Sequence, residues 1–209
     1  IGNRPCRIYG EAHAEYLLFQ MTGEHELQSM ESEVTAIAQS APHFLFAAIP
    51  VESWNDALSP WEAPAVWGKE SFGGDAADTL RFLTEQVIPT LEQQFRLPEN
   101  VKIILGGYSL AGLFALWAST QTDLFYGVAA ASPSVWFPDW MEFEQQRPIQ
   151  TQRVYLSLGD KEENTKNAVM AVVGDNIRTL HSRLAERSTD CTLEWNSGGH
   201  FKDADLRTA

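Results

Sequence analysis

Short apolar runs alternate along the chain with longer stretches whose apolar residues recur at helical spacing. The runs have the length of buried strands and cover residues 15–20, 43–49, 101–105, 124–131, 153–158 and 191–195. The helical stretches cover residues 26–39, 75–95, 110–120 and 166–187. Pro89 should kink or restart the second helix, and Gly174 should interrupt the last. Strands alternating with helices predict an α/β fold, with a mostly parallel central sheet covered by helices on both faces.

The length of 209 residues and the hydrophobic fraction of 44% suit one domain over residues 1–209. We expect residues 50–74, which are rich in Pro, Gly and Trp, to form a long ordered loop. Their large aromatic side chains would be costly to leave in water. No apolar run reaches the ~18 residues that would suggest a membrane span.

The formal net charge of −13 disfavours nucleic acid and anionic membranes as partners, because an acidic surface repels phosphate groups. Cys6 and Cys191 would lie near opposite edges of the sheet, so we expect reduced thiols. The N-terminus has no charged segment followed by an apolar stretch, which favours a cytoplasmic protein without a signal peptide. The chain begins at Ile1 without methionine, and this leaves open a leader that was removed. Nothing in the chain indicates an oligomeric state.

The most informative stretch is residues 101–117, VKIILGGYSLAGLFALW. A predicted strand runs into residues 107–112 (GYSLAG) and then directly into a helix, which is the setting of a nucleophile elbow. Such a turn lifts the Ser109 hydroxyl above the strand end and aims the backbone N–H of Leu110 at the same point. The second glycine of the usual Gly-x-Ser-x-Gly pattern comes one place late, at Gly112. The alternative interpretation is that Ser109 only caps the helix.

A serine hydroxyl is a poor nucleophile, so it needs a base, and the base needs an orienting carboxylate. In this fold the chain order is serine, acid, histidine. His200 follows the last predicted strand, after Gly198 and Gly199, and paired glycines let the backbone turn sharply and present the next side chain. The remaining histidines lie before strands, on a helix or ahead of the serine: His13, His25, His43 and His181.

The acid should follow the strand over residues 153–158, which ends in Gly159-Asp160-Lys161-Glu162-Glu163. We prefer Glu162, because a carboxylate three residues after the glycine commonly curls back toward the histidine. Asp160 is the alternative. Charged residues after a strand are usually only solvated, so this assignment needs the geometry to decide it.

These residues resemble the putative-esterase family of α/β-hydrolases, the group that contains esterase D and the enterochelin esterases. The elbow and the Gly198–Phe201 segment carry most of the resemblance, which extends over nearly the whole chain. The weaker matches occur in the expected order: Met21-Thr22-Gly23, Ile49-Pro50-Val51, Glu85 to Pro89, Ser132-Pro133-Ser134 with Trp136, and Leu158 to Glu163. Two departures are Ala111 in place of glycine, and an end at Ala209 inside the expected last helix.

The resemblance implies a compact hydrolase without a large lid domain, which acts through Ser109, His200 and an acid near Glu162. It places one oxyanion-hole N–H at Leu110 and the other at Met21 or Thr22. It implies a small-molecule ester as substrate and no cofactor or metal. The substrates of the family vary, from siderophore lactones to feruloyl and acetyl esters, so the acyl and alcohol halves stay open.

Two aromatic clusters should lie near the carboxyl ends of the strands, where sites in such sheets are found. They are Trp54, Trp61 and Trp67 in the long loop, and Trp136, Phe137 and Trp140 after the Ser132-Pro133-Ser134 turn. We expect Trp136, Trp54 and Tyr108 in the substrate pocket. The alternative is that the aromatic residues pack the loop against the body.

The sequence therefore predicts a serine esterase in which His200 takes the proton of Ser109. Two alternatives stay open. One is another enzyme on the same fold, namely a thioesterase, an acyltransferase or a peptidase. The other is a non-catalytic binding module that retains the hydrolase fold, although the complete order of serine, acid and histidine argues against it.

Overall fold

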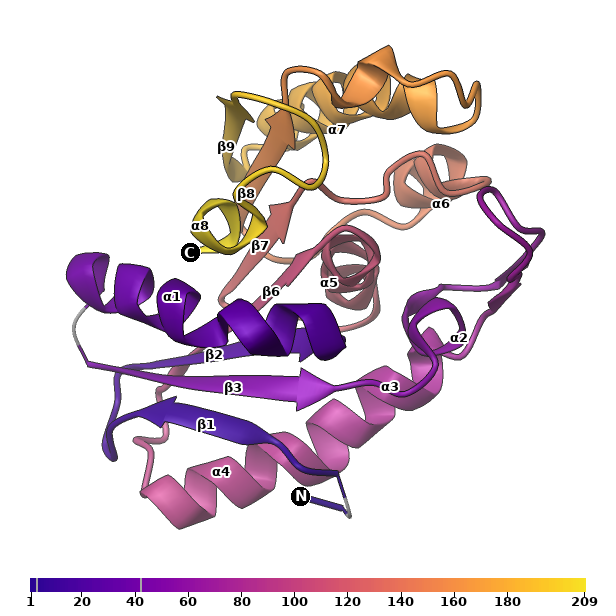
Figure 1. Ribbon diagram of the computed structural model, residues 1–209. Helices are drawn as coiled ribbons and strands as arrows, with labels where there is room; N and C mark the ends of the chain where they lie inside the picture. Colours follow the sequence, from indigo (N-terminus) through magenta and orange to yellow (C-terminus); the bar gives the residue numbers. More distant parts are fainter. Residues whose placement is uncertain (3, 42) are drawn as a thin grey trace.

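A central sheet runs through the computed structural model, which describes residues 1–2, 4–41 and 43–209 and leaves out the side chain of His25. In that part of the chain, seven strands pair in the order β1-β3-β2-β6-β7-β8-β9 (Figure 1). They are β1 (Arg7–Gly10), β2 (Tyr16–Thr22), β3 (Phe44–Pro50), β6 (Lys102–Tyr108), β7 (Gly127–Ala131), β8 (Arg153–Gly159) and β9 (Asp190–Asn196). β1 is antiparallel to β3, and all the other neighbours are parallel. The predicted α/β fold with a mostly parallel sheet is confirmed.

Helices follow most of the strands. They are α1 (Glu24–Ser40), α2 (Trp54–Leu58), α3 (Ala76–Phe82), α4 (Ile88–Phe95), α5 (Leu110–Gln121), α6 (Trp140–Gln146), α7 (Val173–Glu186) and α8 (Ala204–Thr208). Short 3₁₀ turns cover Glu162–Asn164 and Met170–Val172. None of the helices in the described residues is long and apolar enough to cross a membrane.

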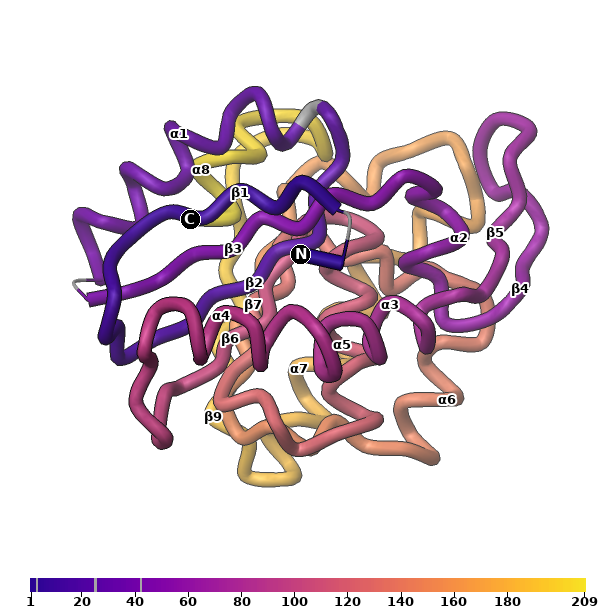
Figure 2. Tube along the Cα trace, turned by 90° about the horizontal axis from the view of Figure 1, so that it is seen from below, coloured from indigo at the N-terminus to yellow at the C-terminus, as the bar shows by residue number. Residues whose placement is uncertain are grey.

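The helices cover both faces of the sheet (Figure 2). α1 and α8 lie on one face, where Met30, Phe44 and Phe46 form a small core under α1. α3, α4, α5 and α7 lie on the other face, over a much larger core. α5 is buried from Leu110 to Thr120, as its apolar sequence predicts. The carboxyl ends of the parallel strands therefore meet at one edge of a firmly packed body, and that edge carries the site.

One helix prediction is confirmed and one needs correction. The helix expected over residues 75–95 is divided before Pro89: a wider π-helical turn over Leu83–Val87 separates α3 from α4, which restarts at Ile88 with Pro89 in its first turn. A π-turn makes room for the proline ring, which in a regular α-helix would meet the carbonyl four residues back. The predicted helix over residues 166–187 begins only at Val173, and Gly174 lies in its first turn rather than interrupting it. A Cβ at Gly174 would lie 1.8 Å from the Glu163 carboxylate, so glycine lets that side chain approach.

The long loop over residues 50–74 contains α2 and a short hairpin of β4 (Glu62–Ala63) and β5 (Phe72–Gly73), which the sequence did not predict. The edge strand β1 was also missed. Cys6 directly precedes β1 at one edge of the sheet, and Cys191 lies in β9 at the other. Both thiols are free, as expected.

The connection from β6 to α5 is the tightest turn that bears on the site. Ser109 alone separates the strand from the helix, and its backbone has φ 57° and ψ −120°. A non-glycine residue in such a conformation costs on the order of 1–3 kcal/mol. Three backbone hydrogen bonds hold it there: Ser109 N–H donates to the Ala131 carbonyl at 3.0 Å, and the Ser109 carbonyl accepts from Ser134 at 3.0 Å and from Leu113 at 3.1 Å. The predicted strand–turn–helix is present, and the serine is not an ordinary helix cap.

Two glycines allow this turn. A Cβ at Gly107 would lie 2.5 Å from the backbone carbon of Ala111. A Cβ at Gly112 would lie 2.9 Å from the Gly107 carbonyl oxygen and 3.2 Å from Pro133. The first turn of α5 thus packs directly on the end of β6. Glycine is needed at position 112, one place later than in the usual Gly-x-Ser-x-Gly pattern, because α5 contacts β6 and Pro133 there.

Gly107→Ala should destabilise the protein by roughly 2–4 kcal/mol, because the new methyl group meets backbone that cannot move aside. Gly106→Ala is the matched control, since its Cβ would find atoms no closer than 3.6 Å. We expect the control to change stability by less than about 1 kcal/mol. Denaturant unfolding of both variants measures the difference, and equal stability of the two would contradict the tight-turn account.

Candidate active site

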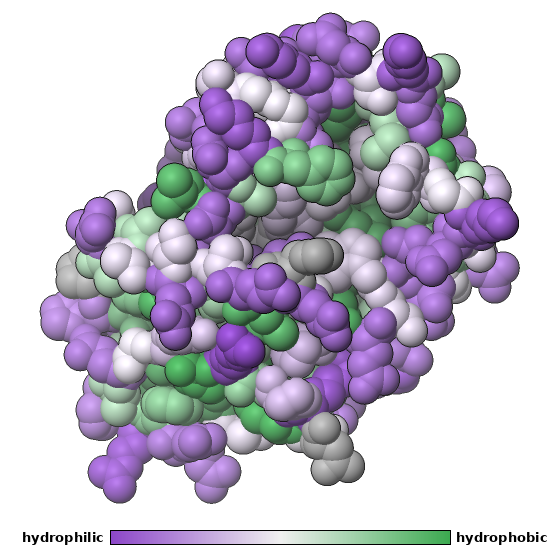
Figure 3. Space-filling model, viewed as in Figure 1, coloured by the Kyte–Doolittle hydropathy of each residue, from purple (hydrophilic) through white to green (hydrophobic). Residues whose placement is uncertain are grey.

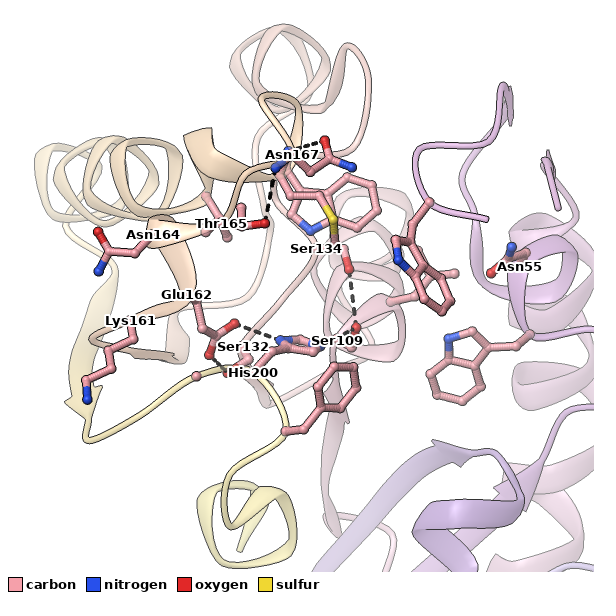
Figure 4. Close-up of a pocket in the computed structure, with 18 of the residues that line it drawn as sticks. Asn55, Ser109, Ser132, Ser134, Lys161, Glu162, Asn164, Thr165, Asn167 and His200 are labelled. Atoms are coloured by element: carbon pink, nitrogen blue, oxygen red, sulfur yellow. Dashed lines mark hydrogen bonds and ion pairs between the residues drawn. The ribbon is translucent and has the colours of Figure 1, made fainter. Parts of the chain in front are cut away.

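Three side chains from separate segments meet in series at the carboxyl edge of the sheet (Figure 4). The Nε2 atom of His200 lies 3.0 Å from Ser109 Oγ. On the other side of the same ring, His200 Nδ1 lies 2.7 Å from Glu162 Oε2. Ser109 comes from the β6–α5 turn, Glu162 from the turn after β8, and His200 from the loop after β9. The structure brings together the serine, the histidine and the preferred acid of the sequence prediction.

The Glu162 carboxylate is almost fully enclosed, with 5% of its side chain exposed. Its Oε1 atom accepts hydrogen bonds from Gly159 N–H at 2.8 Å, from Ser132 Oγ at 2.7 Å and from Arg207 at 2.7 Å. Burial alone would raise the pKa of Glu162. Hydrogen bonds from His200, Ser132 and Arg207, together with the charge of His200, outweigh burial and lower the pKa to about 2. Glu162 is therefore an ionised acceptor at neutral pH.

Asp160, the alternative acid, has a different contact. Its Oδ1 atom accepts a hydrogen bond from Gly198 N–H at 2.7 Å, and Lys161 N–H donates to the Gly198 carbonyl at 3.1 Å. These bonds fasten the loop that carries His200 to the end of β8. Asp160 thus anchors the histidine loop, whereas Glu162 contacts the histidine ring.

The remaining histidines that can be placed lie elsewhere. His13 is exposed, His43 pairs with Glu11 at 2.7 Å on the surface, and His181 lies on α7. The side chain of His25 lies outside the described residues. Among the residues that the structure does describe, no group of three or more His, Cys, Asp or Glu could hold a metal ion.

A cavity of about 530 Å³ opens beside Ser109. Its wall is largely apolar and aromatic: Trp54, Trp67, Phe72, Leu110, Trp136, Met170, Val173 and Phe201. The polar side chains on the wall include Asn55, Ser134 and Asn167, and Lys161 points away from Ser109 (Figure 4). Figure 3 shows a hollow in the middle of this face, with hydrophobic residues along part of its rim and hydrophilic ones below it.

The aromatic residues of the two predicted clusters separate into two groups. Trp54, Trp67 and Trp136 line the cavity. Trp61 packs between Phe137 and Phe143, with ring centres 5.7 and 5.1 Å away, and its Nε1 donates to the Pro138 carbonyl at 3.2 Å. Trp140 is fully buried. Packing of the loop and formation of the pocket are thus both present, in different residues.

Tyr108 does not belong to the cavity wall as far as the chain is described, which corrects the prediction. The Tyr108 side chain is 6% exposed, and its hydroxyl donates to the His200 carbonyl. Its ring lies 5.2 Å from the His200 ring, centre to centre. Burial raises the pKa of Tyr108, so the hydroxyl stays protonated and can donate. Tyr108 is directed away from the cavity because alternate residues of a strand such as β6 face opposite sides of the sheet.

The predicted oxyanion residues Met21 and Thr22 also differ from expectation. β2 extends to Thr22, so both residues lie in the ladder with β3, opposite Ile49 and Pro50. Their side chains are buried, and among the described residues the cavity wall includes neither. Leu110, the other predicted donor, does line the cavity at the first position of α5.

Sequence reasoning missed three residues around the acid and the nucleophile. Arg207 and Ser132 contact Glu162, and Ser134 Oγ lies 3.5 Å from Ser109 Oγ. The Ser132-Pro133-Ser134 turn was noticed but given no partner. Arg207 carried no local signal, because a single arginine near the end of a chain is usually solvated.

A family model described as "Putative esterase" matches residues 20–202. Among curated proteins, the uncharacterized protein YbbA of Bacillus subtilis is 25% identical over 171 residues, which are 78% of this chain and 67% of YbbA. The ferri-bacillibactin esterase BesA of Bacillus subtilis is 29% identical over 121 residues, which are 54% of this chain but only 40% of BesA.

Among solved structures, an IroE-like serine hydrolase from Shewanella oneidensis superimposes with a TM-score of 0.79 at 18% identity. The superposition covers 97% of this chain and 72% of that one. At this identity the likeness shows the fold, which is that of α/β-hydrolase esterases. Because the family model spans most of the sequence, the chain belongs to the putative-esterase family.

Proposed function

We propose that this protein is a serine esterase that hydrolyses a carboxylic ester through an acyl-enzyme on Ser109. The observation that carries the proposal is the unbroken series from Ser109 Oγ through His200 to Glu162, with steps of 3.0 and 2.7 Å. Such a series is the arrangement that activates a hydroxyl at neutral pH. The strained backbone of Ser109 and the aromatic cavity beside it support the same conclusion.

In the proposed first half-reaction, His200 Nε2 takes the proton of Ser109 as Oγ attacks the ester carbonyl carbon. The carbonyl electron pair moves to the oxygen, and the tetrahedral intermediate collapses as His200 returns the proton to the departing alcohol. Water then attacks the acyl-enzyme with His200 again as base, which releases the acid and restores Ser109. Glu162 stays ionised throughout, holds the Nδ1–H tautomer and stabilises the imidazolium.

The oxyanion needs backbone donors beside Ser109. The N–H of Leu110 is one, because it opens α5 and has no acceptor within the helix. For the second we propose Glu24, the first residue of α1. The Gly23 N–H already donates to Glu26 Oε2 at 3.0 Å, and Met21 and Thr22 belong to β2. Gly23 lies against Trp54, so the start of α1 is next to the cavity wall.

The wall of the cavity favours an ester that carries an aromatic group. Five of its residues are Trp or Phe, and Lys161 on its wall points away from Ser109. Aromatic walls bind planar rings well and give little to short alkyl chains. BesA is named for a siderophore ester, ferri-bacillibactin. We include siderophore esters among the aromatic esters proposed here.

Two other functions remain distinguishable by experiment. A thioesterase, acyltransferase or peptidase would use the same three residues, and a panel of ester, thioester and peptide substrates separates them. A binding module that only retains the fold would not react at Ser109. Labelling by a fluorophosphonate separates that case from all the enzymes, because the reagent needs an activated serine.

Ser109→Ala should lower kcat/KM for p-nitrophenyl acetate by about four orders of magnitude or more, because no other group can form the acyl-enzyme. Ser134→Ala is the matched control, since it removes the nearest other hydroxyl from the same wall. We expect the control to stay within about tenfold of the unmodified enzyme. Similar turnover by Ser109→Ala and the unmodified protein would refute the nucleophile.

Glu162→Gln should lower kcat by about 10²–10⁴-fold, because a neutral amide can neither hold the Nδ1–H tautomer nor stabilise the imidazolium. Asp160→Asn should stay within about tenfold, since an amide oxygen can still accept from Gly198 N–H. Steady-state kinetics on the pair measures the contrast. A larger loss in Asp160→Asn than in Glu162→Gln would show that the wrong carboxylate has been assigned.

Trp67→Ala should weaken binding of aromatic acyl groups with little effect on folding, because Trp67 lines the cavity yet is 82% exposed. We expect kcat/KM for p-nitrophenyl cinnamate to fall about three- to tenfold relative to p-nitrophenyl acetate, which is worth ~1 kcal/mol. Trp195→Ala removes a half-exposed tryptophan of β9 that packs against Arg178 of α7, and should leave that ratio unchanged. An unchanged ratio in Trp67→Ala would contradict the aromatic-ester proposal.

A further inference from the structure

One arginine outside the predicted site is turned inward onto the acid. Arg207 lies on α8, which follows the histidine loop and packs against α1, β6 and β7. Its side chain is 5% exposed. A charged guanidinium is withdrawn from water here, which is unfavourable unless partners compensate for the lost hydration. The hydrogen bonds of the guanidinium must therefore compensate for its burial.

The guanidinium contacts both the acid and the loop that carries the base. One terminal nitrogen donates to Glu162 Oε1 and to Ser132 Oγ, each at 2.7 Å. The other donates to the carbonyls of Gly199 at 3.1 Å and Lys202 at 3.2 Å, on either side of His200. One rigid planar group thus spans the two segments whose separation sets the distance between Glu162 and His200.

Arg207 shares the Oε1 atom of Glu162 with two other donors. Gly159 N–H, Ser132 and Arg207 all donate to Oε1, so rotation of the carboxylate would break three hydrogen bonds, and Oε2 faces His200 Nδ1. We propose that Arg207 is a positioning residue that holds Glu162 and the His200 loop in reactive register. This inference rests on the proposed function, because it assigns a role within that triad.

The positive charge also acts on the base through the shared carboxylate. Three titratable or charged side chains face Glu162: His200 of the loop after β9, Arg207 of α8 and Tyr108 of β6. Arg207 also lies near Tyr155 of β8. A cation on the far side of Glu162 opposes a second cation on the imidazole. Without Arg207, the protonated imidazole is favoured, so the acid limb of the kcat/KM profile should move to higher pH. A purely structural role would lower activity without moving that limb.

The test compares Arg207→Met, Arg207→Lys and Arg178→Met. Arg178 is the matched control, because it pairs with the neighbouring Glu163 at 2.9 Å but does not contact Glu162. We expect Arg207→Met to lower kcat about 10–100-fold with KM changed less than about threefold, and to move the acid limb up by about 0.5–1 pH unit. Arg207→Lys should recover part of both effects, and Arg178→Met should resemble the unmodified enzyme.

Two readouts keep this inference separate from the proposed function. Failure of the unmodified protein to label at Ser109 with a fluorophosphonate would count against the proposed function itself. The low-field proton resonance of the His200–Glu162 hydrogen bond reports on register without any turnover, and Arg207→Met should shift or broaden it. The inference is overturned by an unchanged resonance together with an unmoved acid limb, or by a loss of kcat that follows only the fraction of unfolded protein and is not rescued by lysine.

Discussion

The site depends on a buried carboxylate that several segments must share. Glu162 is removed from water, and burial by itself would favour its protonated form. Donors from β8, from the turn after β7, from the histidine loop and from α8 reverse that preference. These donors can compensate for burial only when all the segments are in place. Once buried, Glu162 is therefore ionised only in the assembled site.

The nucleophile is held by a second, independent constraint. Ser109 has a backbone conformation that L-residues avoid, and it persists because α5 is buried along its length and the Ala131 and Ser134 backbone bonds fix the turn. The constrained turn holds the Ser109 hydroxyl at the end of β6. The hydrogen bonds around Glu162 hold the His200 ring so that its Nε2 lies 3.0 Å from that hydroxyl. The aromatic wall then supplies the space for a substrate on the remaining side. Each part is built from a different element of the sheet edge, and the parallel strands bring their carboxyl ends together.

Local sequence signals predicted the parts of this arrangement that one segment determines. The apolar runs indicated every parallel strand, and residues 107–112 indicated the elbow, because glycine spacing and a strand–helix junction are both local. β1 was missed because an edge strand has no continuous apolar run, and Met21 and Thr22 were assigned to a loop because the end of β2 depends on its pairing with β3. The contacts of Arg207 and Ser132 with Glu162 were not predicted, since these residues lie 45 and 30 positions away from Glu162 and no sequence motif connects them to it. The choice between Glu162 and Asp160 was open for the same reason.

A crystal structure of the protein after reaction with an aromatic phosphonate tests the central claim most directly, because the adduct reproduces the tetrahedral intermediate. The account predicts phosphorus bonded to Ser109 Oγ, a phosphoryl oxygen accepting a hydrogen bond from Leu110 N–H, and the aromatic group within the cavity lined by Trp54 and Trp136. His200 should remain between Ser109 and Glu162. An adduct on any other residue, or an imidazole at position 200 turned away from the phosphonate, would contradict it.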